Sequence, residues 1–223
     1  SLLGLATGSS PVGIYRNLIK WHSEGLLDFS AVKTVSLDEY VGLGASDPQS
    51  YRHFMNENLF NHINIKMENT HVPNGLAEDL WMEVLEYEKR IEMLGGIDMQ
   101  LLGIGRNAHI GFNEPSDNFA TNTHVVNLTK DTREANARFF SSIDEVPTKA
   151  LTMGTGTIMR AKKIVLVSYG ENKADALYKS FFENTNPRVP GSILQYHADV
   201  TVVADKAAMG RILSEGKDIN CGF

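Results

Sequence analysis

IDMQLLGIGRNAHIGFNEP, residues 97–115, is the stretch that decides the fold of this chain. Its apolar first half is typical of a buried strand, and the glycines that follow allow a sharp turn where the strand ends. Asn107, His109 and Glu114 come directly after that turn, and all three side chains are suited to handling protons. Ligands of an open α/β sheet bind beyond the carboxyl ends of its strands, so these residues are predicted to line a binding site.

Apolar segments alternate with segments of helical spacing along the rest of the chain. Strands are predicted at residues 2–6, 32–37, 97–104, 164–169 and 200–204, and helices at 12–21, 49–60, 80–94, 133–140, 148–159 and 172–182. The clearest helical pattern, at 80–94, has one apolar stripe made of Leu80, Val84, Leu85, Ile91 and Leu94. This alternation indicates an α/β fold, a mostly parallel sheet with helices on both faces. No repeat or linker divides the sequence, so residues 1–223 are expected to form one domain.

The composition argues against several classes of function. A net charge of −6 and a pI near 5.6 provide no basic surface for nucleic acid. No apolar run approaches the roughly 20 residues of a membrane span, and the amino terminus lacks the basic region of a signal peptide. The single cysteine, Cys221, cannot form an internal disulfide, which fits a reducing compartment. We therefore expect a cytoplasmic protein without nucleic-acid or membrane partners.

Thr7-Gly8-Ser9-Ser10 lies between the first predicted strand and the first predicted helix. Backbone N–H groups and small hydroxyls at a helix amino terminus can hold a phosphate. The turn has neither the GxGxxG spacing nor the lysine of a P-loop, so it suits a small phosphomonoester better than a nucleotide. The alternative is an ordinary helix cap, because serine and threonine often precede helices.

Asp38 follows the strand predicted at 32–37 and has Glu39 beside it. Adjacent residues at a strand end point to opposite sides, so only one of the two carboxylates needs to face a cleft. A carboxylate in that position can act as a general base when its surroundings raise its pKa toward neutrality. The alternative is that one of them caps the turn that follows.

His109 and Glu114 are close enough in sequence for the carboxylate to orient or charge the imidazole, and such a pair moves protons near neutral pH. No further ligands stand at a recognised metal spacing, so no metal is expected. The alternative is a satisfied histidine in a polar loop. Arg138 and Lys173, considered alone, are interpreted as ordinary surface charges.

Five segments, in this order, resemble the glucosamine-6-phosphate deaminase family: LGLATGSSPVGIY, SLDEYVGL, LLGIGRNAHIGFNEP, DTREANARFF and ALTMGTGTIMRAKKIVLV. The resemblance covers nearly the whole chain. It implies a Rossmann-like α/β fold shared with ribose-5-phosphate isomerase and 6-phosphogluconolactonase. It also implies hydrolysis at a carbon–nitrogen bond, in which glucosamine 6-phosphate becomes fructose 6-phosphate and ammonia without a metal or organic cofactor.

The same resemblance implies a role for each candidate residue. Asp38 matches the family's general base, which moves a proton from C2 to C1 of the open-chain sugar through a cis-enolamine. His109 matches the histidine that opens the pyranose ring, Glu114 matches the carboxylate that tunes it, and Asn107 stands where members carry Asp or Asn. The substrate phosphate is then expected on Thr7, Gly8, Ser9, Ser10, Arg138 and Lys173.

The sequence departs from the family pattern in two places. Members regulated by N-acetylglucosamine 6-phosphate carry basic residues after the FNEP motif, whereas residues 116–129 offer only His124 and have Val126 at a basic position. An unregulated monomer is therefore expected. Members also carry about one more strand and helix before the first motif, so we expect either a truncated sequence or a sheet that lacks one edge.

Two alternative functions remain open on sequence alone. A 6-phosphogluconolactonase-like enzyme of the same fold would hydrolyse a sugar-phosphate ester and would not require Asp38 as a carbon base. A non-catalytic sugar-phosphate sensor would bind the same kind of ligand, although regulators of that kind normally add a DNA-binding segment.

Overall fold

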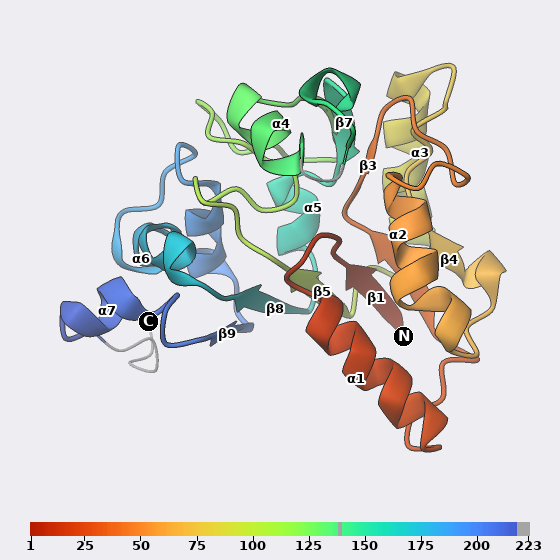
Figure 1. Ribbon diagram of the computed structural model, residues 1–223, viewed down its shortest axis with the longest axis horizontal. Coiled ribbons are helices and arrows are strands. Elements are labelled where there is room, and N and C mark those ends of the chain that lie inside the picture. Colours follow the sequence, from red (N-terminus) through yellow and green to blue (C-terminus); the bar gives the residue numbers. More distant parts are fainter. Residues whose placement is uncertain (138–139, 218–223) are drawn as a thin grey trace.

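A computed structural model describes residues 1–137 and 140–217 (Figure 1). Within these residues, the main element is a six-stranded sheet with the order β4-β2-β1-β5-β8-β9, in which all neighbouring strands pair in parallel. Its strands are β1 (Leu2–Leu5), β2 (Lys33–Ser36), β4 (Thr70–His71), β5 (Met99–Leu102), β8 (Lys163–Ser168) and β9 (Val200–Ala204). The predicted mostly parallel α/β sheet is confirmed.

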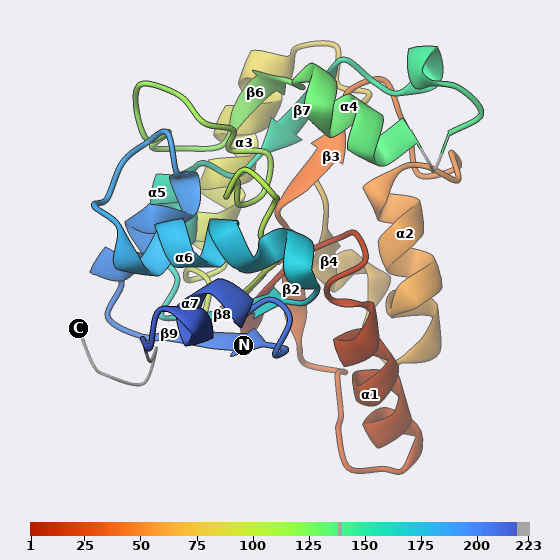
Figure 2. The same ribbon diagram turned by 60° about the vertical axis from the view of Figure 1, so that its left-hand side comes forward.

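The strand order reverses between β1 and β5. The chain moves outward from β1 through β2 to β4, returns to β5, and then moves outward through β8 to β9. Right-handed crossovers in opposite directions place the connecting helices on opposite faces of the sheet. In both views, α1 (Val12–Ser23) and α2 (Tyr51–Asn58) lie to one side, whereas α6 (Ala174–Phe182) and α7 (Gly210–Ser214) lie to the other (Figures 1 and 2). The reversal leaves a crevice beyond the carboxyl ends of β1 and β5.

A second, three-stranded antiparallel sheet stands next to this crevice, at the top of Figure 2. Its order is β3-β7-β6, with β3 (Asp38–Tyr40), β7 (Lys149–Thr152) and β6 (His124–Asn127). The chain passes from one sheet to the other at Leu37, whose N–H donates to Leu5 of the main sheet at 3.0 Å. The carbonyl of Leu37 accepts from Met153, which follows β7, at 2.8 Å. Asp38 is therefore placed where the two sheets meet.

The helix predicted at residues 148–159 is wrong in its first half. Residues 149–152 form β7, and only α5 (Thr155–Met159) is helical. Ala150, Leu151 and Thr152 are all buried, because β7 is the central strand of the second sheet and is covered by its partners. A short apolar run has the same appearance in a buried strand as in a buried helix, so periodicity alone did not separate the two.

The other predicted helices are present with shifted ends. α3 (Leu80–Met93) begins after Asp79, whose side chain accepts N–H groups of the first turn, as an N-cap residue does. α4 (Lys130–Asn136) begins three residues earlier than the predicted start. Short 3₁₀ helices complete the described residues, namely η1 (Phe60–His62), η2 (Met67–Asn69), η4 (Ile143–Glu145), η5 (Glu171–Lys173) and η6 (Pro190–Tyr196).

The buried face of α3 differs from its predicted apolar stripe. Leu85 is 48% exposed, whereas Glu88 is buried. The Glu88 carboxylate accepts hydrogen bonds from Thr123 and Thr157 and forms an ion pair with Arg160 at 2.6 Å. A buried charge is tolerated when it is paired and hydrogen-bonded, so this polar side chain takes a core position that apolarity did not predict.

The edges of the main sheet are β4 and β9, and β1 lies inside it. The side chain of Val203 on β9 is 52% exposed, and that of Met99 on β5 is 40% exposed, so part of one sheet face reaches the surface. The opposite side of these strands packs into the main core, where Leu102, Ile164 and Leu166 are fully buried. None of the helices among the described residues has the length and apolar character needed to cross a membrane.

Candidate active site

The predicted site residues gather around one cavity beyond the carboxyl ends of β1, β2 and β5. The cavity has a volume of about 580 Å³. Of the predicted residues, those that line it are Thr7, Gly8, Ser9, Ser10, Asp38, Asn107, His109 and Lys173. Glu114 is not part of this lining and contacts His109 from behind. Arg138 lies outside the described residues.

The turn at residues 7–10 connects β1 to α1 and forms one wall of the cavity. The N-cap of α1 is Pro11, which makes no side-chain hydrogen bond to the helix, and the first turn of α1 carries no acidic residue. The serines of this turn therefore do not serve as an ordinary cap of α1. The amino terminus of this helix can attract an anion such as a phosphate.

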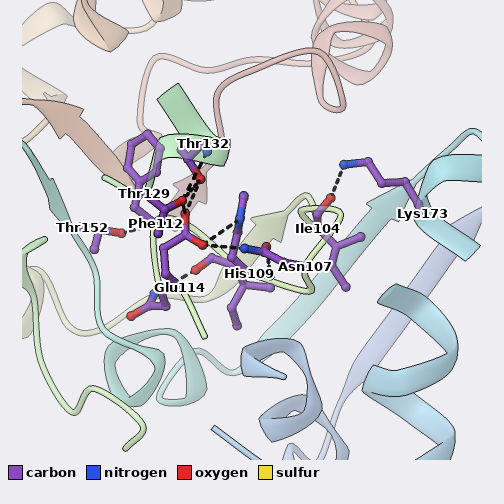
Figure 3. Close-up of polar contacts among 11 residues, drawn as sticks. Ile104, Asn107, His109, Phe112, Glu114, Thr129, Thr132, Thr152 and Lys173 are labelled. Atoms are coloured by element: carbon purple, nitrogen blue, oxygen red, sulfur yellow. Dashed lines mark hydrogen bonds and ion pairs between the residues drawn. The ribbon is translucent and has the colours of Figure 1, made fainter. Parts of the chain in front are cut away.

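Lys173 ends η5, just before α6, and lines the same cavity. Its Nζ donates a hydrogen bond to the carbonyl of Ile104 at 2.7 Å, which ties the ammonium group to the end of β5 (Figure 3). Lys173 is therefore a cavity residue and not an ordinary surface charge. Its positive charge and the amino terminus of α1 make this part of the cavity suitable for an anion.

Asp38 and Glu39 face in opposite directions, as the strand geometry predicts. Glu39 is buried and accepts hydrogen bonds from the backbone N–H groups of Tyr40, Tyr51 and Arg52 at 2.8, 2.9 and 2.9 Å. It therefore holds the start of α2 against β3. Asp38 faces the cavity, so one carboxylate has the capping role and the other remains in the site.

Asp38 is surrounded by little that can stabilise its negative charge. Asp38 is only 5% exposed, and among the described residues only the hydroxyl of Thr7 donates a hydrogen bond to its side chain, at a long 3.4 Å. Burial raises the pKa of Asp38 to about 8, the nearby charge of Glu39 adds to the effect, and the Thr7 hydroxyl opposes it. A carboxylate with such a pKa is a competent base near neutral pH.

The GRNAH loop, residues 105–109, carries Asn107 and His109 into the cavity. Two backbone hydrogen bonds close it: Gly105 N–H donates to the His109 carbonyl at 2.8 Å, and Ala108 N–H donates to the Gly105 carbonyl at 3.0 Å. The imidazole of His109 lies against Gly105, where a Cβ would stand 2.3 Å from the ring atom Cε1. Only glycine leaves room for the ring, which explains the residue at this position.

Glu114 is held by donors from two parts of the chain (Figure 3). Its Oε2 accepts from Asn107 Nδ2 at 2.6 Å and lies 3.7 Å from His109 Nδ1, an electrostatic contact rather than a hydrogen bond. Its Oε1 accepts from the hydroxyl of Thr132 and, at 3.4 Å, from that of Thr129. Burial acts to raise the pKa of Glu114, but His109, Thr132 and Asn107 outweigh it and lower the pKa to about 2.

Asn107 links the two charged partners. Its amide nitrogen donates to Glu114, and its oxygen accepts the backbone N–H of His109 at 3.2 Å. The neutral amide therefore orients the loop that carries the imidazole and leaves Glu114 as the charged neighbour of His109. The Glu114 carboxylate thus places a fixed negative charge next to the imidazole.

Sequence reasoning missed three residues of this site. Thr129 and Thr132 reach Glu114 from the start of α4, and Tyr51 lines the cavity beside Asp38. Thr129 carries a recognisable signal, because it caps α4 by accepting the N–H of Thr132 at 3.2 Å. Tyr51 carries no such signal in the sequence. Its ring stacks on Phe112, and its hydroxyl lies 3.2 Å from that of Tyr40.

Comparisons with known proteins agree with this geometry. The sequence profile described as "Glucosamine-6-phosphate isomerases/6-phosphogluconolactonase" matches residues 2–203. The chain belongs to this family. A glucosamine-6-phosphate deaminase of Clostridioides difficile (strain 630) is 57% identical over 212 residues, which are 95% of this chain and 85% of that protein. A glucosamine-6-phosphate deaminase of Thermoanaerobacter pseudethanolicus is 55% identical over 215 residues, with 96% and 85% covered.

Solved structures of this family separate into two levels of similarity. A monomeric glucosamine-6-phosphate deaminase of the NagB superfamily superposes with a TM-score of 0.92 at 50% identity, covering 95% of this chain and 88% of that one. The 6-phosphogluconolactonase of Thermotoga maritima superposes with a TM-score of 0.70 at 18% identity, covering 92% and 85%. The second likeness shows a shared fold, whereas the first extends to the sequence.

Among the described residues, no three His, Cys, Asp or Glu side chains gather closely enough to hold a metal ion. The polar groups at the cavity form separate units: the turn at residues 7–10 with Lys173, the buried carboxyl group of Asp38, and the imidazole of His109 with Glu114 behind it.

Proposed function

We propose that this chain is a glucosamine-6-phosphate deaminase, which converts glucosamine 6-phosphate and water into fructose 6-phosphate and ammonia. The observation that carries the proposal is that Asp38, with its raised pKa, shares one cavity with His109 and with the anion-binding turn at residues 7–10. Relatives that are 55–57% identical over most of the chain are glucosamine-6-phosphate deaminases.

The phosphate group anchors the substrate in this proposal. It binds at the amino terminus of α1, on Thr7, Gly8, Ser9 and Ser10, and pairs with Lys173. Arg138 is proposed as the second basic ligand on the strength of the family resemblance. A phosphate fixed at one end of the cavity presents the other end of the sugar to Asp38 and His109, so the reacting carbons are held in place before the chemistry begins.

The first chemical step opens the ring. His109 moves a proton from the anomeric hydroxyl to the ring oxygen, which breaks the bond between C1 and that oxygen and leaves an aldehyde at C1. Glu114 acts through His109 and not on the sugar, because it lies outside the cavity lining. Its lowered pKa keeps it ionised, so its charge stabilises the imidazolium that forms during the transfer.

The second step moves a proton between two carbons. Asp38 removes the proton from C2, the electrons form a C1–C2 double bond, and the C1 oxygen takes a proton from the ammonium group on C2, which gives an enolamine. Asp38 then returns its proton to C1, and the nitrogen becomes an iminium at C2. Water adds to C2 and ammonia leaves, so fructose 6-phosphate is the product. Asp38 takes up one proton and releases it again within the same turnover, and a pKa near 8 allows both directions of transfer.

The two alternative functions are less well supported. Hydrolysis of a lactone requires a water nucleophile and no carbon base, so it does not require Asp38 in that role. A sensor that only binds sugar phosphates gives no use to the Asn107, His109 and Glu114 network. The 6-phosphogluconolactonase of Thermotoga maritima shares 18% identity with this chain and therefore supports the fold alone.

The assembly and setting of the enzyme are part of the same proposal. We propose a single-domain, unregulated monomer, in line with the monomeric deaminase that is 50% identical. Sedimentation should show one protomer, and rate curves should be hyperbolic and unaffected by N-acetylglucosamine 6-phosphate. A cytoplasmic site of action fits a substrate whose charged phosphate does not cross membranes. Sigmoidal curves relieved by N-acetylglucosamine 6-phosphate would contradict this part of the proposal.

The decisive experiment supplies glucosamine 6-phosphate to the purified chain and measures ammonia and fructose 6-phosphate in equal amounts. A parallel reaction with 6-phosphogluconolactone tests the nearest alternative. Release of ammonia without lactone hydrolysis is the expected result. Lactone hydrolysis without ammonia would replace the proposed reaction by the lactonase, and binding without turnover of either compound would point to the sensor.

A further inference from the structure

Ala108 adopts an unusual backbone conformation between the two cavity residues of the GRNAH loop. Its φ is +65°, and it is the one non-glycine residue with a positive φ among the described residues. This conformation brings Cβ close to the backbone and is costly for an L residue other than glycine. Ala108 is also buried, at 1% exposure. Strain of this kind persists only where the surrounding structure imposes it, and it is concentrated at functional sites.

The contact that holds Ala108 comes from a distant part of the chain. Gly191, in the first turn of η6, donates its N–H to the Ala108 carbonyl at 2.8 Å. A Cβ at position 191 would stand 3.2 Å from that carbonyl oxygen and 2.6 Å from Ser180 Oγ. The first distance is tighter than nine in ten real Cβ contacts, so with a side chain at 191 the Ala108 carbonyl would have to move by a few tenths of an ångström, and the Ser180 hydroxyl would have to shift as well. Gly191 is thus the residue that lets η6 approach the loop.

The segment just before Gly191 contacts the residues that follow Glu114. The carbonyl of Pro187 accepts the N–H of Ser116 at 3.2 Å, and Arg188 forms an ion pair with Asp117. Residues 187–191 therefore contact the chain on both sides of the stretch that carries His109 and Glu114. The Gly191 contact is the buried one, whereas Arg188 and Asp117 are exposed and their ion pair contributes little.

We propose that Gly191 and Ala108 form a positioning pair that sets the direction of the His109 imidazole. Gly191 binds the carbonyl of the peptide that leads directly into His109, and Ala108 stiffens the loop because few conformations are open to it. The proposal rests on the proposed function, in which His109 opens the sugar ring. Neither residue lines the cavity, so both act through His109 and not on the substrate.

A small displacement of the GRNAH loop would change the position of the His109 ring. The His109 ring is confined by Gly105 on one side, and its Nδ1 lies 3.7 Å from Glu114 Oε2 on the other. A loop displaced by a few tenths of an ångström changes this electrostatic contact and the direction in which the ring faces the sugar. Misplacement of a reacting group by about 1 Å can cost about 100-fold in rate.

The test is the variant Gly191→Ala, which adds one methyl group at the contact. We expect kcat for glucosamine 6-phosphate to fall about tenfold or more, with KM changed by less than about twofold, because the phosphate turn is untouched. The double variant Ala108→Gly/Gly191→Ala should regain most of the loss. Glycine at 108 adopts many backbone conformations without strain, so the peptide between residues 108 and 109 can turn to accommodate the new methyl group while the ring returns to its place.

Gly210→Ala is the matched control. A Cβ at Gly210 meets no atom within 4 Å, so the same change in size there should leave kcat and KM as they are. A Gly191→Ala variant with wild-type kcat would overturn the proposal. A loss of kcat that the second substitution does not restore would also overturn it, because that outcome indicates a general loss of structure. If Gly191→Ala is insoluble, a soluble and active double variant supports the pair, and an insoluble one contradicts it.

NMR of the His109 ring provides a readout that needs no substrate. At fixed pH, the ring resonances should move in Gly191→Ala, return in the double variant and stay in place in Gly210→Ala. A wild-type chain that releases no ammonia but shows this pattern would refute the deaminase function and leave the positioning pair intact. Unchanged resonances in Gly191→Ala would refute the pair, whatever the activity of the wild type.

Discussion

Asp38 lies just after the end of β2 and Glu114 lies in the loop that follows β5, and the structure drives the pKa values of these two carboxylic acids in opposite directions. Asp38 lies at the junction of the two sheets with one long hydrogen bond, and burial raises its pKa to about 8. Glu114 lies behind the GRNAH loop, where His109, Thr132 and Asn107 outweigh its burial and lower its pKa to about 2. Burial is common to both, so the supply of donors decides the difference.

Because of this difference in pKa, the two carboxyl groups can serve different chemical roles. A group whose pKa is near the pH of the solution can both take and return a proton. The transfer of a proton from C2 to C1 requires this of Asp38. A group that stays ionised at every physiological pH cannot carry a proton between substrate atoms, but it provides a fixed negative charge. Two environments on one fold therefore separate a base from an electrostatic partner. Each of the following predictions tests that separation.

The largest effect is expected at Asp38. Asp38→Asn keeps the shape of the side chain and removes its basic oxygen, so kcat should fall by roughly 1,000-fold, within the range known for general bases. Sugar-phosphate binding should remain measurable by calorimetry, because the phosphate turn is unchanged. Asp199→Asn, at an exposed ion pair with Lys163, is the control and should keep full activity. Near-normal turnover in Asp38→Asn would end the assignment of Asp38 as the base.

A smaller effect, selective for one substrate form, is expected at His109. His109→Gln removes the ring-opening group and should slow the cyclic amino sugar by about 100-fold. An open-chain substrate analogue bypasses this step, so its turnover should fall much less. Stopped-flow assays with both compounds give the comparison. Equal slowing of the two would show that His109 serves a step other than ring opening.

Glu114→Gln should have the third-largest effect. The amide keeps the size of the side chain but loses the charge beside His109, and a hydrogen bond to a charged group contributes about 1.5–3 kcal/mol. We expect kcat to fall about tenfold or more while KM changes little, because Glu114 does not line the cavity. A large rise in KM instead would mean that Glu114 binds the sugar directly.

The same variant has a consequence for acid stability. A carboxyl group whose folded pKa lies below its unfolded value stabilises the fold above the unfolded pKa, near 4.5, and this stabilisation is lost as the pH falls toward 2. Glu114→Gln should therefore lower Tm at pH 7 and leave it nearly unchanged at pH 2. Thermal scans at both pH values, with Glu134→Gln on the exposed face of α4 as control, measure the difference.

The smallest effect concerns stability at alkaline pH and has the opposite sign. The folded protein holds the Asp38 proton more tightly than the unfolded chain does, so stability is lost as the pH rises from about 4 to about 8. Asp38→Asn cannot ionise and should gain Tm relative to the wild type above pH 8. A gain of about 2–4 °C is expected for each kcal/mol in a protein of this size. Equal Tm values at pH 9 would contradict the raised pKa.

Much of the fold can be predicted from the sequence, because the parallel strands are apolar and separated by helices. The second sheet is harder to predict. Residues 149–152 have the composition of either element, and only their pairing with residues 38–40 and 124–127 makes them a strand. Leu85 and Glu88 exchange their expected environments for a similar reason, since partners distant in sequence decide whether Glu88 can be buried.

The candidate site, like the fold, can be predicted only in part from the sequence. Asp38 and His109 can be predicted because each follows a strand, and the carboxyl ends of parallel strands meet at one edge of the sheet. Thr132 and Gly191 cannot be linked to His109 from the sequence, because the contacts that connect them cross between separate elements. The backbone of Ala108 is equally hidden, since alanine carries no signal for a positive φ.

The difference between the pKa values of Asp38 and Glu114 is measured most directly by titrating both carboxyl groups with ¹³C NMR. The variants Asp38→Asn and Glu114→Gln assign their signals. We expect Asp38 to titrate near pH 8 and Glu114 to stay ionised down to about pH 2. If both groups titrate together near pH 4, the two environments do not separate a base from a fixed charge. That result would contradict the different roles assigned to Asp38 and Glu114.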